Sequence, residues 1–174
     1  DDAVTLIYGI NHERFDPSRH RLVSAASCTT TAVAHMLKPV FDHIDPATVM
    51  TASMSTVHAA TNTQSLLDSV PGAGAGDLRK SRSALNSIIL TSTNAAEALE
   101  RVLPEIRTIG FMADSVRVPV PTESLAILNI TFQSAITRRE QSSVDRLVLN
   151  DIYRTAAEGA QRGLLVYSEE QNVP

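Results

Sequence analysis

The stretch Ser24-Ala25-Ala26-Ser27-Cys28-Thr29-Thr30-Thr31 organises the chain, because an extended apolar run ends there and a helical pattern begins. The apolar residues that follow have the spacing of one helix face, i, i+3, i+4, i+7, i+8 and i+11: Val33, Met36, Leu37, Val40, Phe41 and Ile44. Pro39 is expected to kink this helix or to end it early. Cys28, the only cysteine of the chain, therefore stands at the start of a predicted helix.

We interpret Cys28 as a nucleophile. The unpaired backbone N–H groups in the first turn of a helix carry partial positive charge, which stabilises a thiolate and any oxyanion formed beside it. The alternative is a small, inert core residue, because free cysteines are among the most buried residue types. A single cysteine does not decide between the two.

Length and composition indicate one well-packed core. The chain has 174 residues, of which 43% are hydrophobic. Its net charge of −4 argues against a nucleic-acid-binding protein. One cysteine excludes an intrachain disulfide framework and fits a reducing compartment. Because no signal peptide opens the chain and no apolar run approaches the ~20 residues that span a bilayer, we expect a cytoplasmic protein without a membrane partner.

The second candidate residue, His58, lies in a predicted strand. Residues 47–60 alternate in the manner of a β-strand, and one side of it carries Met50, Ala52, Met54, Thr56 and His58. A lone histidine on such a face is commonly a structural residue with satisfied hydrogen bonds. A catalytic role needs further support from the surrounding residues.

The remaining patterns predict a mixed set of elements. Strands are expected over residues 111–120, 125–137 and 164–167, and helices over residues 94–102 and 142–157. Four residues of the last helix are expected to face the core: Val144, Leu147, Val148 and Ile152. Gly159 marks its expected end. Strands without strict helix alternation predict an α+β fold, a mixed, largely antiparallel sheet with helices packed on one face.

Two motifs surround the candidate residues, Ser27-Cys28-Thr29-Thr30 and Thr56-Val57-His58-Ala59-Ala60-Thr61-Asn62. Taken together, they resemble the catalytic region of the glyceraldehyde-3-phosphate dehydrogenase family. The resemblance continues in the family's order through Asp77-Leu78-Arg79-Lys80-Ser81-Arg82, Thr91-Ser92-Thr93-Asn94-Ala95-Ala96, Val102-Leu103-Pro104-Glu105 and Arg117-Val118-Pro119-Val120-Pro121. The Cys, His and Arg-Val-Pro motifs are jointly specific and cover most of the chain.

The resemblance implies a role for each matching residue. Cys28 is expected to add to an aldehyde and His58 to take the hydroxyl proton, after which inorganic phosphate opens the thioester. The residues that match the substrate-phosphate site are Thr61 and Arg117, with Lys80 standing where many members have arginine. Those that match the attacking-phosphate site are Ser27, Thr29, Thr93 and Asn94.

Three of these matches have a second interpretation or depart from the family. Thr93 can equally be the N-cap of the following helix. Asn94 replaces a family glycine, and we expect it to keep the turn because asparagine tolerates positive φ. Lys80 lies in a basic cluster that is otherwise read as a solvated face, and lysine grips phosphate less well than arginine does.

The resemblance also implies a domain division and partners. Residues 1–27 are expected to close a nucleotide-binding domain and lead into the catalytic cysteine, and residues 28–174 to form a catalytic domain incomplete at its C-terminal end. No Gly-x-Gly-x-x-Gly turn is present, so NAD, or NADP, is expected to bind mainly a domain absent from this chain, which alone is expected to be inactive. The implied substrates are glyceraldehyde 3-phosphate and inorganic phosphate, and the implied assembly is a homotetramer.

Two alternatives stay open at this point. A related enzyme, such as erythrose-4-phosphate dehydrogenase, shares the cysteine and histidine chemistry. A non-catalytic interaction module is the other, because a fragment without a cofactor domain does not transfer hydride.

Overall fold

The computed structural model describes residues 2–133 and 144–172, and they fall into two compact units. The first unit contains Asp1–Ala52, Ala95–Phe111 and Ile130–Gln171. The second contains Ser53–Asn94, Met112–Asn129 and Asn172–Pro174. Each of three long strands has one end in the first unit and the other end in the second.

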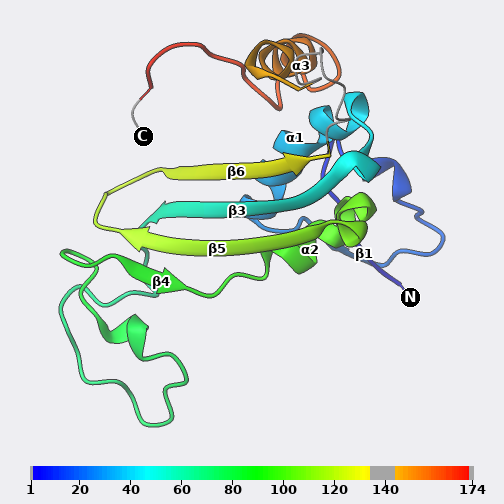
Figure 1. The fold of residues 1–174 in the computed structure, drawn as a ribbon. Coiled ribbons are helices and arrows are strands. Elements are labelled where there is room, and N and C mark those ends of the chain that lie inside the picture. The colour runs from blue at the N-terminus through cyan, green and yellow to red at the C-terminus, as the bar shows by residue number, and fades with distance from the viewer. Residues whose placement is uncertain (1, 134–143, 173–174) are drawn as a thin grey trace. The chain divides into compact units, whose positions relative to one another are not determined.

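The described residues form an α+β fold, as predicted (Figure 1). Its helices are α1 (Cys28–His43), α2 (Ala95–Val102) and α3 (Arg146–Glu158). Its strands are β1 (Ala3–Thr5), β2 (Leu22–Ser24), β3 (Val49–Ala59), β4 (Ile89–Thr91), β5 (Gly110–Val118) and β6 (Ser124–Phe132). The larger sheet has the order β4-β5-β3-β6, and β1 pairs with β2 in parallel. The β4–β5 pair is antiparallel, and the arrows of Figure 1 show β3 parallel to β5 and opposite to β6.

Helix α1 begins where the sequence predicts it. Ser27 is the N-cap, and its Oγ accepts a hydrogen bond from the Thr30 N–H at 3.1 Å. The expectation that Pro39 ends the helix early is wrong, because α1 continues to His43. Leu37 and Val40, on either side of the proline, are both buried, and this packing holds the helix together through the missing N–H.

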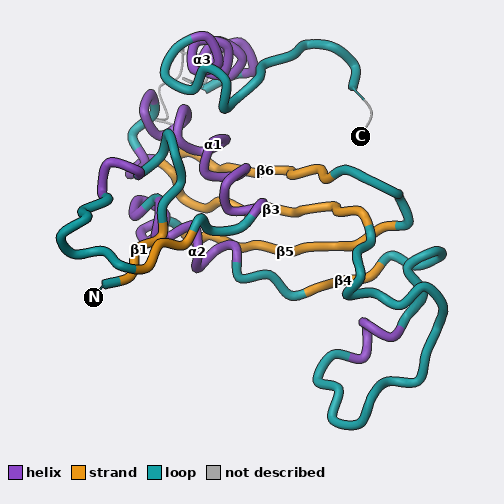
Figure 2. Tube along the Cα trace, turned by 180° about the vertical axis from the view of Figure 1, so that it is seen from behind, coloured by secondary structure: helices purple, strands orange, loops and turns teal. Residues whose placement is uncertain are grey.

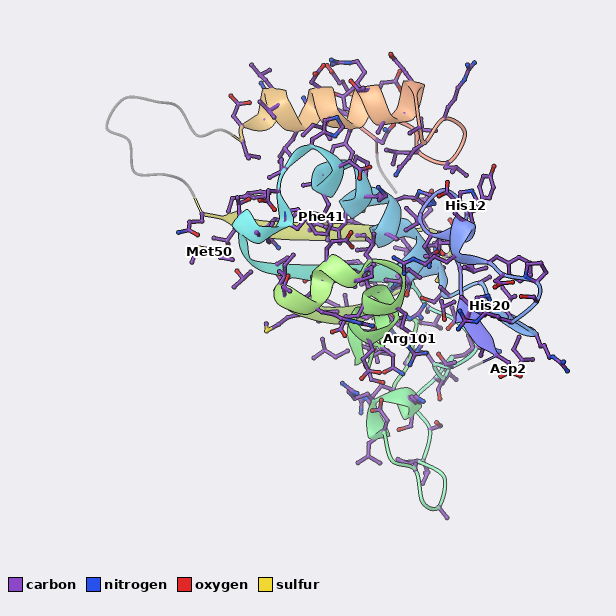
Figure 3. All side chains as sticks on the ribbon, turned by 90° about the vertical axis from the view of Figure 1, so that its right-hand side faces the viewer. Asp2, His12, His20, Phe41, Met50 and Arg101 are labelled. Carbon is purple, nitrogen blue, oxygen red and sulfur yellow. The ribbon has the colours of Figure 1, made fainter. Side chains whose placement is uncertain are left out.

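The core of the first unit lies between α1 and the sheet. Val49, Ala52 and Ile109 are buried there, and partly buried aromatic and aliphatic side chains pack against them: Phe41, Phe111, Ile130 and Phe132. Figure 3 shows Phe41 between the helix and the strands. Within this unit α1 and α2 lie on the same face of the strands (Figure 2), which is the one-sided arrangement predicted from the sequence.

The third helix is attached to α1. The Tyr153 hydroxyl donates a hydrogen bond to the Met36 carbonyl at 2.8 Å, and burial raises the pKa of that phenol. Gly159 follows the last residue of α3, as predicted. Of the four residues expected to face the core from this segment, Ile152 is buried, but Leu147 is 68% exposed and Val148 is 39% exposed, so those two assignments are wrong.

Met50, near the start of β3, is 59% exposed, and the regular alternation of burial begins at Ala52. One strand prediction differs from the structure. Residues 164–167 form no strand; Gly163, at a φ of +80°, turns the chain back after α3. The parts of the predicted elements at residues 134–137 and 142–143 lie outside the described residues.

Gly9 occupies a backbone conformation that disfavours any side chain. Its φ is +80°, and a Cβ built on it lies 2.5 Å from Leu164 Cδ1 and 3.3 Å from His35 Cε1. We expect Gly9→Ala to destabilise the fold by about 2–3 kcal/mol, the sum of backbone strain and overpacking. Chemical denaturation measures this free energy of unfolding.

Gly163→Ala is the matched control for Gly9→Ala. Gly163 has the same φ of +80°, but a Cβ on it meets nothing within 4 Å. It should therefore cost only the backbone strain, about 1–2 kcal/mol. Equal losses in the two variants would contradict the close packing around Gly9.

Candidate active site

Cys28 is the first residue of α1, and its side chain is exposed. This exposure excludes the inert-core interpretation. Ala26, two residues earlier, has a φ of +61°, a left-handed conformation that costs a non-glycine residue about 1–2 kcal/mol. Such strain is commonly retained where a functional group must be held in one direction. Here it sets how the chain enters the helix that carries the thiol.

Hydroxyl groups surround the start of α1. Ser27 Oγ lies 2.8 Å from Thr30 Oγ1, and Cys28 Sγ lies 4.0 Å from Thr29 Oγ1. The first turn of α1 contains no acidic residue, so the partial positive charge of its N–H groups is not neutralised by a carboxylate there. This end of the first unit thus combines a thiol with donors suited to an anion.

In the second unit, His58 lies near the end of β3 and is buried. Its Nδ1 is 2.6 Å from Ser124 Oγ. Burial lowers the pKa of the His58 imidazole, and the positive charge of Arg117 lowers that pKa further. The imidazole is therefore neutral at physiological pH, which is the state that a general base requires.

Ser124 is a site residue that the sequence motifs did not reveal. It is brought to His58 by the pairing of β3 with β6, in which the Ala59 N–H donates to the Glu123 carbonyl at 3.0 Å. Glu123 has a φ of +84°, so the chain turns sharply just before the serine. No sequence spacing relates residues 58 and 124; the only signal is that Ser124 directly precedes the strand predicted over residues 125–137.

Arg117 extends from β5 toward the end of β3. Its Nη1 donates to the Ala59 carbonyl at 3.1 Å, whereas its Nε is buried and has no hydrogen-bond partner among the described residues. A buried guanidinium N–H without a partner is costly unless a ligand accepts from it. Arg117 thus has both charge and an unused donor beside His58.

Thr61 follows the end of β3 in the same unit. Its Oγ1 lies 3.1 Å from Thr63 Oγ1 and 3.3 Å from Gln64 Oε1. Together with Pro119 and Leu85 it lines a cavity of about 630 Å³. Two residues predicted to bind the substrate phosphate are thus both close to Ala59. Thr61 follows it by two residues, and Arg117 donates a hydrogen bond to its carbonyl.

Lys80 has different neighbours from Thr61 and Arg117. It belongs to the short 3-10 helix Leu78–Ser81 and lines a different cavity, of about 350 Å³, with Ser65 and Asp77. Its basic neighbours form ion pairs, Arg79 with Asp77 and Arg82 with Asp68, which fits the interpretation of those two as a solvated face.

Thr93 and Asn94 follow β4. Helix α2 begins at Ala95, so Asn94 directly precedes it and Thr93 lies one residue earlier. The two roles considered for Thr93, N-cap and phosphate ligand, stay predictions. Among the described residues, the non-glycine positions with positive φ are Ala26 and Glu123. Asn94 therefore does not have positive φ, and the expectation that it keeps such a turn is wrong.

Comparison with protein families relates these residues to known proteins. The family described as glyceraldehyde 3-phosphate dehydrogenase, C-terminal domain, matches residues 27–174. The chain belongs to the glyceraldehyde-3-phosphate dehydrogenase family. The matched residues begin one position before Cys28 and include His58 and Arg117.

Individual members of the dehydrogenase family align along almost the whole chain. Glyceraldehyde-3-phosphate dehydrogenase 2 of Streptomyces avermitilis is 37% identical over 171 residues, and the enzyme of Kitasatospora aureofaciens is 41% identical over 167 residues. The enzyme of Geobacillus stearothermophilus is 36% identical over 171 residues. These alignments cover 96–98% of this chain and 46% of each relative, so the chain spans about half the length of these curated relatives.

Two further properties of the dehydrogenase-family chain concern membranes and metals. Within residues 2–133 and 144–172, no helix has both the length and the apolar composition needed to cross a bilayer. In the same described part, no cluster of three or more His, Cys, Asp or Glu side chains is arranged to hold a metal ion.

The charge of Arg117 should be measurable in the titration of His58. Arg117→Gln removes the positive charge that disfavours the imidazolium, so we expect it to raise the pKa of His58 toward the usual histidine value. NMR titration of the His58 ring measures that pKa directly. Arg82→Gln, which replaces an exposed arginine paired with Asp68, is the control. An unchanged His58 pKa in Arg117→Gln would show that burial alone lowers it.

Proposed function

We propose that the whole protein is a phosphorylating glyceraldehyde-3-phosphate dehydrogenase of glycolysis and gluconeogenesis, and that this chain supplies its catalytic residues. The overall reaction oxidises glyceraldehyde 3-phosphate with NAD, or NADP, and inorganic phosphate to 1,3-bisphosphoglycerate. The observation that carries this proposal is the exposed Cys28 on the first turn of α1, within the part that matches the family's C-terminal domain.

In the first step, Cys28 acts as the nucleophile. Its thiolate forms a C–S bond with the aldehyde carbon, and the carbonyl π electrons move to oxygen. That oxygen takes up the proton released when the thiol ionised, which produces a neutral hemithioacetal. The N–H groups of the first turn of α1 stabilise the oxyanion that develops on the aldehyde oxygen. No acidic residue in that turn opposes them.

His58 takes the hydroxyl proton of the hemithioacetal. We assign the Nδ1–H as donor to Ser124 Oγ, across the 2.6 Å contact, which makes Nε2 the ring nitrogen that accepts the proton. Ser124 is then a positioning residue, because it selects the tautomer and orientation of the imidazole. The lowered pKa of His58 keeps the base in its neutral form before the reaction.

Phosphate groups are bound by the hydroxyl and cationic side chains. Arg117, with its buried and unused Nε–H, and Thr61 are proposed to hold the substrate phosphate, with Lys80 as a further cation. The proposed site of the attacking phosphate consists of Ser27, Thr29, Thr93 and Asn94. An oxygen of that phosphate bonds to the thioester carbon, and the C–S bond breaks to return the Cys28 thiolate.

A nicotinamide cofactor bound to the whole protein would supply the acceptor for the hydride that leaves the aldehyde carbon. Among the described residues, β1 and β2 form a two-stranded parallel pair, without a glycine-rich turn between a strand and a helix. We propose that the cofactor binds mainly a domain outside this chain, and we assign no residue of this chain a role in hydride acceptance. We propose that residues 1–27 are the end of the nucleotide-binding domain, that residues 28–174 belong to the catalytic domain, and that the whole protein is a cytoplasmic tetramer.

Steady-state assays of the whole protein test the proposal. NAD reduction is expected with glyceraldehyde 3-phosphate, and the rate should depend on inorganic phosphate. A higher kcat/KM with erythrose 4-phosphate would assign the protein to the related dehydrogenase instead. Absence of reduction with both aldehydes and both dinucleotides would support a non-catalytic interaction module.

A further inference from the structure

A cavity lined by three arginines lies in the first unit, and none of the residues assigned to the active site lines it. The cavity, of about 630 Å³, is bounded by β1, β2, the turn that follows β1, α2 and the 3-10 helix Pro104–Thr108. Cavities of this size, roughly 300–1,000 Å³, commonly hold small molecules. Its walls include Thr5 and Ser24, which offer hydroxyl groups. Figure 3 shows Arg101, from α2, on the side of the unit that also carries Asp2 and His20.

The charge of this cavity is its distinguishing property. Arg14, Arg101 and Arg107 all line it, and the lining residues within the described part of the chain include no Asp or Glu. The ion pairs of the described residues involve other basic side chains, namely Lys38, Arg79, Arg82 and Arg154. Three arginines therefore line one cavity, with no carboxylate among its described lining residues, in a chain whose net charge is −4.

The backbone that carries Arg14 is firmly held. Asn11, only 5% exposed, accepts a hydrogen bond from the Ile7 N–H at 2.7 Å and donates to the Thr5 carbonyl at 2.9 Å. The Arg14 N–H in turn donates to the Asn11 carbonyl at 3.0 Å. Asn11 itself lines the cavity, so a buried amide ties the turn to β1 and sets the position of the first arginine.

The other two arginines also come from anchored elements. Arg101 is in the last turn of α2, between Leu99 and Val102, each 1% exposed. Arg107 follows Ile106, which is also 1% exposed. Arg101 lies in the last turn of α2, where a basic residue interacts favourably with the helix dipole. That interaction does not explain why Arg14, Arg101 and Arg107 all line one cavity.

We propose that this cavity binds a small polyanion that carries two or more phosphate groups. Guanidinium groups bind phosphate oxygens through paired, charge-assisted hydrogen bonds, and three of them match more charge than one phosphate supplies. The site is separate from the active site proposed above, since none of the residues assigned there lines the cavity. The proposed polyanion site does not depend on dehydrogenase activity and is a separate ligand site in the first unit.

Calorimetric titration with inorganic pyrophosphate tests this site. The whole protein is used with Arg117→Gln present throughout, so that the proposed substrate-phosphate site contributes little to the signal. Arg101→Gln and Arg107→Gln should each weaken pyrophosphate binding by about tenfold or more, the effect of losing a charge-assisted hydrogen bond. Binding should also weaken steeply as salt is raised.

Arg19→Gln is the matched control, because Arg19 is an exposed arginine outside the cavity. It should leave pyrophosphate affinity unchanged. Equal weakening in Arg19→Gln and Arg101→Gln would indicate nonspecific attraction and overturn the proposal, as would a Kd above about 1 mM in the protein with all three cavity arginines intact. In a background with native Arg117, Arg101→Gln should leave the rate of aldehyde oxidation unchanged, which separates this site from the proposed function.

Discussion

Cys28→Ser is expected to abolish aldehyde oxidation by the whole protein. A serine hydroxyl at the start of α1 remains un-ionised at neutral pH and does not form the C–S bond on which both halves of the proposed reaction depend. The loss should reach the detection limit in a steady-state assay and persist at saturating aldehyde. Thr31→Ser, also in the first turn but without an assigned role, should retain activity.

The same residue can be tested without turnover. An exposed thiol at a helix N-terminus is expected to react with iodoacetamide faster than a thiol in an unstructured peptide. Mass spectrometry of the peptide that contains Cys28 measures this rate in the folded protein. A rate equal to that of the peptide thiol would remove the nucleophile assignment, whatever the phenotype of the serine variant.

His58→Asn is expected to slow the chemical step by about 10²–10⁴-fold while Cys28 remains alkylatable. Asparagine keeps a polar group that can hydrogen-bond to Ser124, but it cannot accept the hemithioacetal proton. Single-turnover kinetics separate this step from product release. Wild-type rates in His58→Asn would show that the histidine has a structural role only, which its burial in β3 would explain.

Ser124→Ala tests the same base with a smaller expected loss of turnover. It removes the hydrogen bond to Nδ1 but leaves the imidazole, so turnover should fall by less than in His58→Asn, about tenfold or more. A purely structural role would change stability without moving the pH profile of turnover, whereas loss of the positioning bond should shift its acid limb. Ser55→Ala, which removes the hydroxyl that bonds Asp114 from the same strand β3, is the control.

The sequence alone determined the elements whose signals are local. The apolar periodicity after Cys28 predicted α1, and an N-cap serine with a matching first turn is enough to start a helix at that position. The alternation over residues 47–60 predicted a strand, and the structure has β3 over Val49–Ala59. The family motifs identified both Cys28 and His58, because a motif is recognised from residue identities and their spacing and needs no knowledge of packing.

Tertiary structure decided everything that depends on partners distant in sequence. Pro39 is accommodated inside α1 because its neighbours are buried, and Leu147 is exposed although its spacing suits a core face. Ser124 reaches His58 only through the pairing of β3 with β6, and a histidine's ionisation depends on burial and on the charge of Arg117, neither of which a spacing encodes. The same holds for the arginine-lined cavity, since Arg14 lies far from Arg101 and Arg107 in the chain and only the fold brings their charges onto one surface.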